Sequence, residues 1–311
     1  MIAKSISVEL NSPQTASETG ARERIAAFFE LTKPGITFMV VMVAAAAFYL
    51  GARFPFDYAL FFHTLWGVCL LSSGVATLNQ YVERERDRAM RRTANRPIPS
   101  GRITPRQALI FGASLTGLAE LHLAVFVSPL TALLGLGVIV GYILLYTPLK
   151  TRTPLSTVVG AFPGAMPPLF GWAAANAGFK LSSALSIEAW ILFAILFLWQ
   201  FPHFLAIAWI CREDYARAGI CMLPVVEPDG RSTGRQMVVY SLALLPVSLL
   251  PTIVGLTGML YFWGAIALSA FYLWTSVRAA LTLSNRHARH VLLASVLYLP
   301  ILFILMMLDA R

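Results

Sequence analysis

The chain has 311 residues, of which 58% are hydrophobic and only 13% charged, with a net charge of +9 and a mean hydropathy of +0.70. Soluble domains carry about a quarter charged residues, so this composition excludes an ordinary soluble domain and indicates an integral membrane protein. Three scattered cysteines (Cys69, Cys211 and Cys221) exclude a disulfide framework or a zinc site.

The N-terminal segment is polar. Residues 1–20 are rich in Ser, Thr and Asn, and such a composition predicts a disordered tail. In the next segment, 21–33, apolar side chains fall on one helical face and arginines on the other, which predicts a short helix in the membrane interface. This helix should end before Pro34. Residues 21–311 are expected to form a single membrane domain.

Nine apolar runs follow, each close to the length of about 20 residues that a bilayer-spanning helix needs. They occupy 36–54, 58–80, 107–127, 131–149, 155–175, 188–210, 237–257, 259–281 and 290–308. The fifth run is interrupted by Pro163, Pro167 and Pro168. Broken helices at membrane depth are tolerated where they are packed in protein or line a cavity, so we expect this run to border the functional site. The predicted fold is all-α, a polytopic bundle of nine transmembrane helices around a central cavity.

Lysine and arginine are distributed unevenly between the two sides of these spans. With the N-terminus inside, 21 cationic residues fall inside and three fall outside. The inside set is Lys4, Arg22, Arg24, Lys33, eight arginines from Arg84 to Arg106, Lys150, Arg152, Arg212, Arg217, Arg231, Arg235, Arg278, Arg286 and Arg289, and the outside set is Arg53, Lys180 and Arg311. Such an excess marks the cytoplasmic side. It predicts a cytoplasmic N-terminus, explains the net charge, and removes any reason to infer a nucleic-acid partner.

The second run is followed by "LNQYVERERDRAMRRTANRPIPSGR", which places acids among many arginines. If the helix continues past the apolar run, Asn79, Glu83 and Asp87 recur every four residues and stack on one face. One amide and two carboxylates are suitable ligands for Mg²⁺, which is often bound together with the oxygens of a phosphate. The nearby arginines are suited to holding phosphate oxygens. On spacing alone, ion pairs of Glu83 and Asp87 with Arg84, Arg88 and Arg91 on a hydrated helix end explain the pattern equally well.

Two further polar groups fall at the same predicted membrane face. The sixth run ends in "AWICREDYARAGICMLPVV", which contains Glu213 and Asp214, and the fourth run is followed by Lys150 and Arg152. The helix that begins after these cations adds the partial positive charge of its N-terminus, and this combination favours an anion. The simpler interpretations are a helix-end charge cluster and two charges that set the topology.

The sixth run also contains polar residues within its apolar sequence, in "LWQFPHFLAIAW". Gln200 and His203 flank Pro202, where a kink is expected. Polar residues inside a membrane span usually face a cavity or the bundle interior. His203 is therefore a candidate for a structural hydrogen bond, a proton shuttle or an axial ligand, and the sequence does not choose among these roles.

Six segments together resemble the UbiA superfamily of intramembrane prenyltransferases. They are "NQYVERERDRAMRRTANRP", "LTKPGI" at 31–36, "YTPLKTRTP" at 146–154, "GAFPGAMPPLFGW" at 160–172, "WQFPHF" and "REDYARAGICMLPVV". The resemblance extends over nearly the whole chain beyond the tail. Within the superfamily, the proline-rich fifth run and "DYARAGICMLP" are similar to the branch that farnesylates heme.

The resemblance implies a role for particular residues. Asn79, Glu83, Asp87 and Asp214 would be the catalytic residues that bind the diphosphate through Mg²⁺; Lys33, Arg92, Arg96, Lys150 and Arg152 would contact the diphosphate; and Gln200, His203 and Tyr215 would contact substrates. Three departures stand out. Position 83 is Glu where Asp is commoner, and position 86 is Arg where an apolar residue is usual. Ala218 follows Asp214 by four residues where a second acid would complete the motif.

The implied reaction is transfer of a farnesyl group from farnesyl diphosphate to a vinyl group of heme B, which gives heme O. The implied partners are these two substrates, the lipid bilayer, and a heme A synthase or terminal oxidase assembly that receives the product. The acidic residues Glu9, Glu18 and Glu23 argue against a mitochondrial transit peptide. A bacterial inner membrane, with the active site facing the cytoplasm, is therefore favoured over the mitochondrial inner membrane.

Two alternatives remain at this point. In the first, the same reaction has another acceptor: an aromatic acid, a quinone precursor or a chlorophyllide. In the second, the chain is a secondary transporter, which nine spans and a broken helix also suit. A transporter should carry its charged groups near the midplane, whereas this chain concentrates them at one membrane face. The enzyme is therefore the preferred interpretation.

Overall fold

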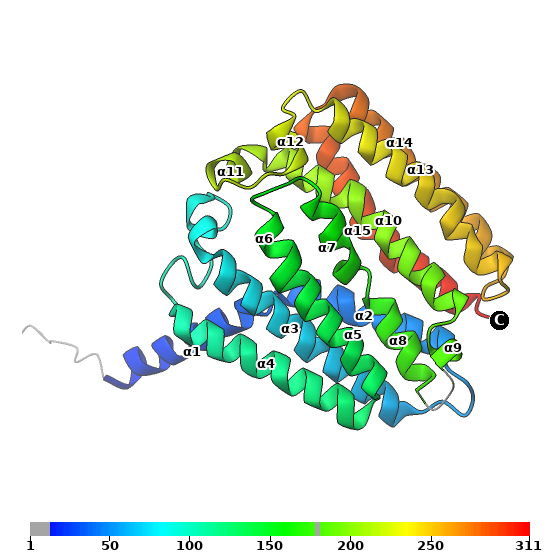
Figure 1. Ribbon diagram of the computed structural model, residues 1–311, viewed down its shortest axis with the longest axis horizontal. Helices are drawn as coiled ribbons and strands as arrows, with labels where there is room; N and C mark the ends of the chain where they lie inside the picture. Colours follow the sequence, from blue (N-terminus) through cyan, green and yellow to red (C-terminus); the bar gives the residue numbers. More distant parts are fainter. Residues whose placement is uncertain (1–12, 178–180) are drawn as a thin grey trace, which may run out of the picture.

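The computed structural model describes residues 13–177 and 181–311, and these residues fold into helices joined by short connections (Figure 1). The elements are α1 (Pro13–Leu31), α2 (Pro34–Gly51), α3 (Tyr58–Ala89), α4 (Pro105–Phe126), α5 (Pro129–Ile139), η1 (Val140–Tyr146), α6 (Thr147–Leu149), α7 (Ser156–Gly164), α8 (Pro167–Ala175), α9 (Leu181–Ala184), α10 (Ile187–Ile210), α11 (Arg212–Arg217), α12 (Leu223–Val226), α13 (Arg231–Ile253), α14 (Met259–Thr282) and α15 (Asn285–Leu308). Nine segments in the described part of the chain are long and apolar enough to cross a membrane. The predicted all-α bundle is confirmed.

Local capping residues explain where several long helices begin. The Asp57 side chain accepts a hydrogen bond from the backbone N–H of Leu60 at the start of α3. At the start of α4, Thr104 and Gln107 form a reciprocal capping box. Ser284 caps α15 in the same way as Asp57 caps α3. These side chains satisfy N–H groups that have no partner within the helix, and they fix the helix boundaries at the membrane edges.

The fifth span is broken, as the sequence predicts. Helix α7 ends at Gly164, and α8 begins at Pro167, whose missing N–H suits the first position of a helix. Helix α8 packs tightly against α2, because a Cβ atom at Gly171 would overlap the carbonyl oxygen of Ala44. The broken span is thereby held inside the bundle, where its side chains are largely buried.

The fourth span departs from regular α-helix, which the sequence does not predict. Residues Val140–Tyr146 form a π-helical segment, η1, between α5 and α6. The Thr147 backbone N–H and its hydroxyl both donate to the carbonyl oxygen of Tyr142. Pro148, the next residue, has no N–H to continue an α-helical pattern. Segments of π-helix are rare and occur frequently at functional sites.

Helix α1 begins earlier than expected. It starts at Pro13, so the last part of the predicted polar tail is helical, and residues 1–12 lie outside the described residues. The predicted apolar face of this helix is divided in the structure. Phe28 packs edge-on against Phe111 of α4, with ring centroids 5.0 Å apart, whereas Ile25 and Phe29 are exposed. Two apolar side chains are therefore available to a lipid surface.

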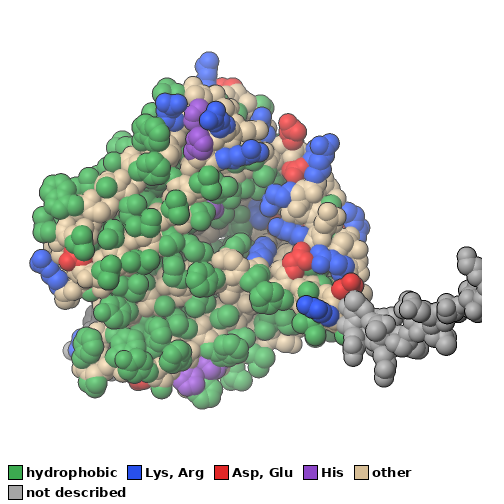
Figure 2. Space-filling view, turned by 180° about the vertical axis from the view of Figure 1, so that it is seen from behind, with side chains coloured by type: hydrophobic (Ala, Val, Ile, Leu, Met, Phe, Trp, Pro, Cys, Tyr) green, Lys and Arg blue, Asp and Glu red, His purple; other side chains and the backbone are tan. Residues whose placement is uncertain are grey.

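The surface of the bundle is divided between apolar and basic regions. Apolar side chains cover most of one broad face, whereas Lys and Arg gather along one edge, beside a hollow (Figure 2). The connection between α3 and α4, together with α11, lies at one end of the bundle (Figure 1). Lys4 and Lys180 of the predicted charge distribution lie outside the described residues. The concentration of basic residues at one edge marks the region where the site is found.

Candidate active site

Helix α3 carries the predicted ladder of oxygen ligands. It continues without a break for 32 residues, so Asn79, Glu83 and Asp87 stack one turn apart on one face. All three are buried, with exposed fractions of 2%, 7% and 1%. The alternative of a hydrated helix end is wrong for these residues. Arg84 and Arg88 instead contact the exposed Glu85.

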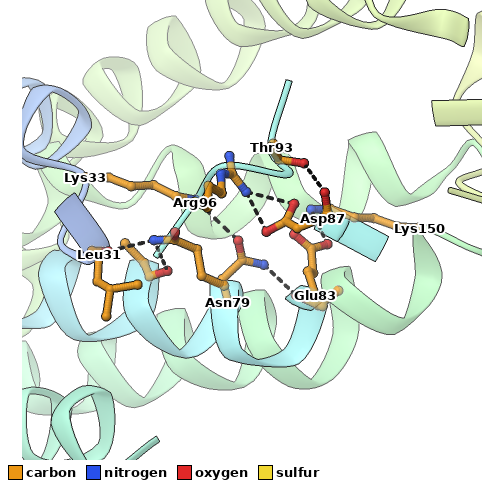
Figure 3. Close-up of polar contacts among 11 residues, drawn as sticks. Leu31, Lys33, Asn79, Glu83, Asp87, Thr93, Arg96 and Lys150 are labelled. Carbon is orange, nitrogen blue, oxygen red and sulfur yellow. Dashed lines mark hydrogen bonds and ion pairs between the residues drawn. The ribbon is translucent and has the colours of Figure 1, made fainter. Parts of the chain in front are cut away.

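Three cations from other segments converge on this ladder (Figure 3). Lys150 Nζ lies 2.7 Å from Glu83 Oε1, and Arg96 Nη1 donates to both oxygens of Asp87, at 2.9 and 2.8 Å. Lys33 Nζ donates to Asn79 Oδ1 at 3.4 Å. Each ladder residue is therefore matched with one cation. Two of these contacts join residues 46 and 67 positions apart in the chain, so the tertiary fold brings them together, whereas Arg96 follows Asp87 by nine positions.

The backbone around Lys33 is held in an unusual conformation. Lys33 has φ 48° and ψ 63°, in the left-handed region, which costs a residue with a side chain about 1 kcal/mol or more. Gln80 on α3 donates to the Leu31 carbonyl oxygen at 2.8 Å. Thr37 donates to the Thr32 carbonyl oxygen at 2.9 Å. These bonds fix the turn between α1 and α2, and the turn aims the Lys33 ammonium at the ladder.

Burial and neighbouring charge change the protonation of these cations in opposite directions. Burial, assisted by the nearby Arg96 and Lys150, lowers the pKa of Lys33 to about 8. Burial also acts to lower the pKa of Lys150, but the adjacent Glu83 carboxylate outweighs it and raises that pKa. Lys150 is therefore a permanent cation at neutral pH, whereas Lys33 is close to its titration range.

Segment η1 and its continuation contribute residues that the sequence reasoning missed. Thr147 is fully buried and accepts a hydrogen bond from Asn79 Nδ2 at 3.3 Å. The Tyr146 ring lies under Lys150 Nζ, 4.3 Å from the ammonium to the ring centroid, a favourable cation–π distance. The signal was present in "YTPLKTRTP", where Tyr and Thr stand directly before the lysine. The sequence predicts a role in the site only for the charged residues of that segment, Lys150 and Arg152.

The second acidic group is built more loosely than the ladder. Asp214 lies on α11, a helix of six residues, and forms an ion pair with Arg217 of the same helix. Its other oxygen accepts a hydrogen bond from the backbone N–H of Arg92, at 3.3 Å. Glu213 is exposed. Asp214 thus links α11 to the loop after α3, the same loop that carries Arg96.

The remaining predicted contacts lie at the same end of the bundle, at different depths. Tyr215 packs beside Met90 and Met222 in a small apolar cluster, and burial raises the pKa of its phenol. The Arg92 and Arg152 side chains are exposed at the surface of the loops. Of the five predicted cations, Lys33, Arg96 and Lys150 contact the ladder. Arg92 and Arg152 lie at the periphery.

Gln200 and His203 lie on α10, away from the acidic residues. Gln200 Nε2 donates to the Ala161 carbonyl oxygen of α7 at 2.8 Å, so its amide binds the broken span to α10. His203 Nδ1 lies 2.7 Å from Ser295 Oγ of α15. The two side chains therefore point toward different neighbours, and the amide nitrogen of Gln200 bonds to the backbone of α7.

The ladder has a suitable donor set for Mg²⁺. Within the part of the chain that the structure describes, no group of three or more His, Cys, Asp or Glu side chains forms a metal site. Mg²⁺ does not require one, because it is commonly held by one or two carboxylates together with substrate phosphates. Glu83 and Asp87 supply two carboxylates and Asn79 an amide oxygen. These three oxygen-bearing side chains therefore fit a metal that arrives with a diphosphate.

Comparison with protein families decides where this arrangement belongs. Residues 39–307 match the UbiA prenyltransferase family. The chain belongs to the UbiA prenyltransferase family. It is similar to proteins named protoheme IX farnesyltransferase: 50% identical over 293 residues to that of Solibacter usitatus, covering 91% of this chain and 98% of that protein, and 42% identical over 310 residues to that of Koribacter versatilis, covering 96% and 98%.

Solved structures of UbiA proteins share the fold. A digeranylgeranylglyceryl phosphate synthase superposes with a TM-score of 0.74 at 17% identity, covering 92% of this chain and 98% of that one. A UbiA homologue from Archaeoglobus fulgidus, bound to DMAPP and Mg²⁺, superposes with a TM-score of 0.66 at 16% identity, covering 90% and 98%. The bundle is therefore a UbiA fold. Membership of a prenyltransferase family also decides against the transporter alternative.

Proposed function

We propose that this UbiA prenyltransferase transfers a farnesyl group from farnesyl diphosphate to a vinyl group of heme B and so produces heme O. The proposal is supported by the relatives named protoheme IX farnesyltransferase, which match nearly the full length of the chain at up to 50% identity. The observation that carries the chemistry is the buried ladder on α3, each member of which contacts one cation. Acids and cations meeting at one point suit a diphosphate that binds with a metal.

The ladder residues would hold the metal, and the cations would hold the diphosphate. Mg²⁺, when bound, supplies positive charge that stabilises the departing diphosphate. Asn79, Glu83 and Asp87 would provide oxygen ligands, and Asp214, which contacts the loop after α3, would supply a further carboxylate. Lys150 and Arg96 exchange their carboxylate partners for diphosphate oxygens. In this way the charges of the site are redistributed without a buried charge being left unpaired.

The reaction itself needs no covalent nucleophile from the chain. The bond between the farnesyl carbon and the diphosphate oxygen breaks, and its electron pair leaves with the diphosphate. The vinyl group of heme attacks the resulting allylic cation, and water adds to the new cationic centre with loss of a proton. Lys33, Arg96 and Lys150 are preorganised to stabilise the negative charge that develops on the leaving group. Arg92 and Arg152 extend this cationic surface at the mouth.

The site is proposed to face the cytoplasm of a bacterial cell from its inner membrane. This orientation is supported by the unequal distribution of lysine and arginine, since an excess of cations marks the cytoplasmic side. Farnesyl diphosphate would then enter from the cytoplasm, with its isoprenoid tail in the apolar bundle. Heme O would leave toward a heme A synthase or terminal oxidase assembly.

A direct assay tests the proposed acceptor. The purified protein in detergent is incubated with heme B, farnesyl diphosphate and Mg²⁺, and the heme is analysed by mass spectrometry. The expected product is heavier than heme B by one farnesyl group and one hydroxyl group from water, and it is absent when EDTA is added. Prenylation of 4-hydroxybenzoate in a parallel reaction, with heme unchanged, would keep the transferase chemistry and overturn the heme assignment.

A further inference from the structure

The hydrogen bonds around His203 determine which of its nitrogens carries the proton. Ser295 Oγ lies 2.6 Å from the Leu292 carbonyl oxygen, a contact that requires a proton between the two oxygens. The hydroxyl has one proton, so it donates to Leu292 and must accept from its other neighbour. That neighbour is His203 Nδ1, at 2.7 Å. The proton of His203 is therefore on Nδ1.

The second nitrogen of this ring, Nε2, then carries a lone pair. Among the residues that the structure describes, no hydrogen bond to Nε2 is found, and Nε2 is not one of the fully buried polar atoms that lack a partner. His203 as a whole is half-buried, so Nε2 is not sealed off by the surrounding side chains. A histidine that ligates a metal has the same arrangement, with one nitrogen donated to a fixed acceptor and the other left unprotonated.

The ring is also held against rotation. Trp199 stacks on His203 at 5.1 Å with an angle of 24° between the rings, and Phe204 meets it edge-on at 5.3 Å and 81°. Trp199 is itself fixed, because its Nε1 donates to the Ser295 carbonyl oxygen at 2.9 Å. One residue of α15 thus orients both rings.

The position of His203 separates it from the other four histidines, all of which are described. It lies seven residues before the end of α10, or about 10 Å below the charged end of the bundle. His63 and His122 contact each other, with ring nitrogens 3.4 Å apart. His287 contacts Thr282 and Ser284 in the turn before α15 and packs edge-on against His290. Only His203 is half-buried within an apolar span and bonded through one ring nitrogen to a hydroxyl of a neighbouring span.

We propose that His203 Nε2 binds the iron of the heme acceptor and holds the porphyrin in the bundle below the diphosphate site. The inference rests on the proposed function, because it takes heme as the acceptor. Ser295 is the positioning residue: it fixes the proton on Nδ1 and makes Nε2 the better ligand. The role that the sequence left open for this histidine is thereby assigned to axial ligation.

Binding spectroscopy tests the proposal without any turnover. Hemin is titrated into the full-length protein in detergent, without farnesyl diphosphate, and the ferrous complex is examined by resonance Raman spectroscopy for an iron–histidine stretch. His203→Gln is expected to abolish this band and to weaken hemin binding on the order of 100-fold, while Ser295→Ala weakens it about tenfold. His122→Gln is the matched control and should leave both readouts unchanged.

Metal-free protoporphyrin IX distinguishes ligation from a structural role. The ring has the same shape and no iron, so its affinity should be the same for the wild-type protein and for His203→Gln. Equal weakening of hemin and protoporphyrin in the variant would overturn the proposal in favour of a packing role. Hemin binding to the wild-type protein without an iron–histidine band would overturn it independently of any variant. If the wild-type protein binds neither porphyrin, the proposed acceptor fails as well.

Discussion

The two acidic groups at the charged end of the bundle are built in different ways. Glu83 and Asp87 lie on a 32-residue helix and are almost fully buried; Glu83 contacts Lys150 from a distant segment, and Asp87 contacts Arg96 from the loop after α3. Asp214 and Glu213 lie on a six-residue helix; the first contacts Arg217 on its own helix, and the second is exposed. The α3 group is thus held by the tertiary fold, whereas the α11 group depends on a short local segment.

This difference indicates a division of roles. Preorganised groups stabilise a transition state without reorganisation at the moment of reaction, and the α3 ladder has that character. Contacts with neighbouring loops tie α11 and the residues after it to the rest of the site. Among them, the backbone N–H of Arg92 donates to Asp214 at 3.3 Å, and the backbone N–H of Cys221 donates to the Lys150 carbonyl oxygen at 2.7 Å. We expect α3 to supply the essential ligands and α11 to supplement them.

The largest effect is expected from the ladder. Asp87→Asn removes a buried carboxylate ligand and the partner of Arg96, and kcat/KM for farnesyl transfer should fall by about 10²- to 10³-fold. Glu85→Gln is the matched control, because Glu85 lies two residues away on the same helix and is exposed. Steady-state kinetics measure both variants. Equal losses in the two would contradict a special role for the buried face.

A second prediction concerns the cation that contacts Glu83. Lys150→Gln should weaken binding of a non-reactive farnesyl diphosphate analogue about 30-fold, through loss of a buried charge-assisted contact worth about 2 kcal/mol. Mg²⁺ alone should bind more tightly to this variant, because Glu83 has lost its competing cation. Isothermal titration calorimetry measures both affinities, with Arg235→Gln, an exposed arginine at the start of α13, as the control. Weakening of both ligands would sink the idea of exchanged partners.

The α11 group should give a smaller effect. Asp214→Asn is expected to lower kcat/KM about tenfold, because one charge-assisted contact is lost while the ladder stays intact. Glu213→Gln, its exposed neighbour, should behave as the wild-type protein. The same kinetic assay compares them with Asp87→Asn. If Asp214→Asn were as damaging as Asp87→Asn, the two groups would be equal partners and the division of roles would be wrong.

The smallest effect is a dependence on pH that arises from Lys33. Its pKa is lowered to about 8, chiefly by burial, so the free protein holds this cation charged below that pH and loses it above. Affinity for the diphosphate analogue should therefore fall roughly fourfold between pH 7 and 8.5. Lys33→Arg should flatten the curve, because arginine remains charged. A wild-type affinity that is constant over this range would show that Lys33 does not contact the diphosphate.

The fold was predictable from the sequence because its signals are local. The lengths of the apolar runs identified the nine spans, and the positions of the prolines identified the break between α7 and α8. Intervals of four residues placed Asn79, Glu83 and Asp87 on one face of a helix. The π-helical segment η1 was not predicted, since nothing in its apolar residues distinguishes it from α-helix. The role of Gln200 stays a prediction for a related reason: polarity inside a span does not reveal which neighbour the side chain contacts.

The sequence could not show which cation contacts which acid within the site. Arg84 and Arg88 are the nearest cations to Glu83 and Asp87 along the chain, yet both contact Glu85. The cations that the ladder contacts come from loops whose positions depend on packing of the entire bundle. Spacing therefore identified the acids, and only the structure identified their partners.

The central claim is that the α3 ladder binds a diphosphate together with a metal. The most direct measurement is the affinity of the full-length protein for a farnesyl diphosphate analogue with a non-cleavable leaving group, with Mg²⁺ and with EDTA, for the wild-type protein and for Glu83→Gln with Asp87→Asn combined. We predict tight binding only for the wild-type protein with Mg²⁺. Equal affinity in EDTA, or a double variant that retains the Mg²⁺-dependent gain, would contradict the claim.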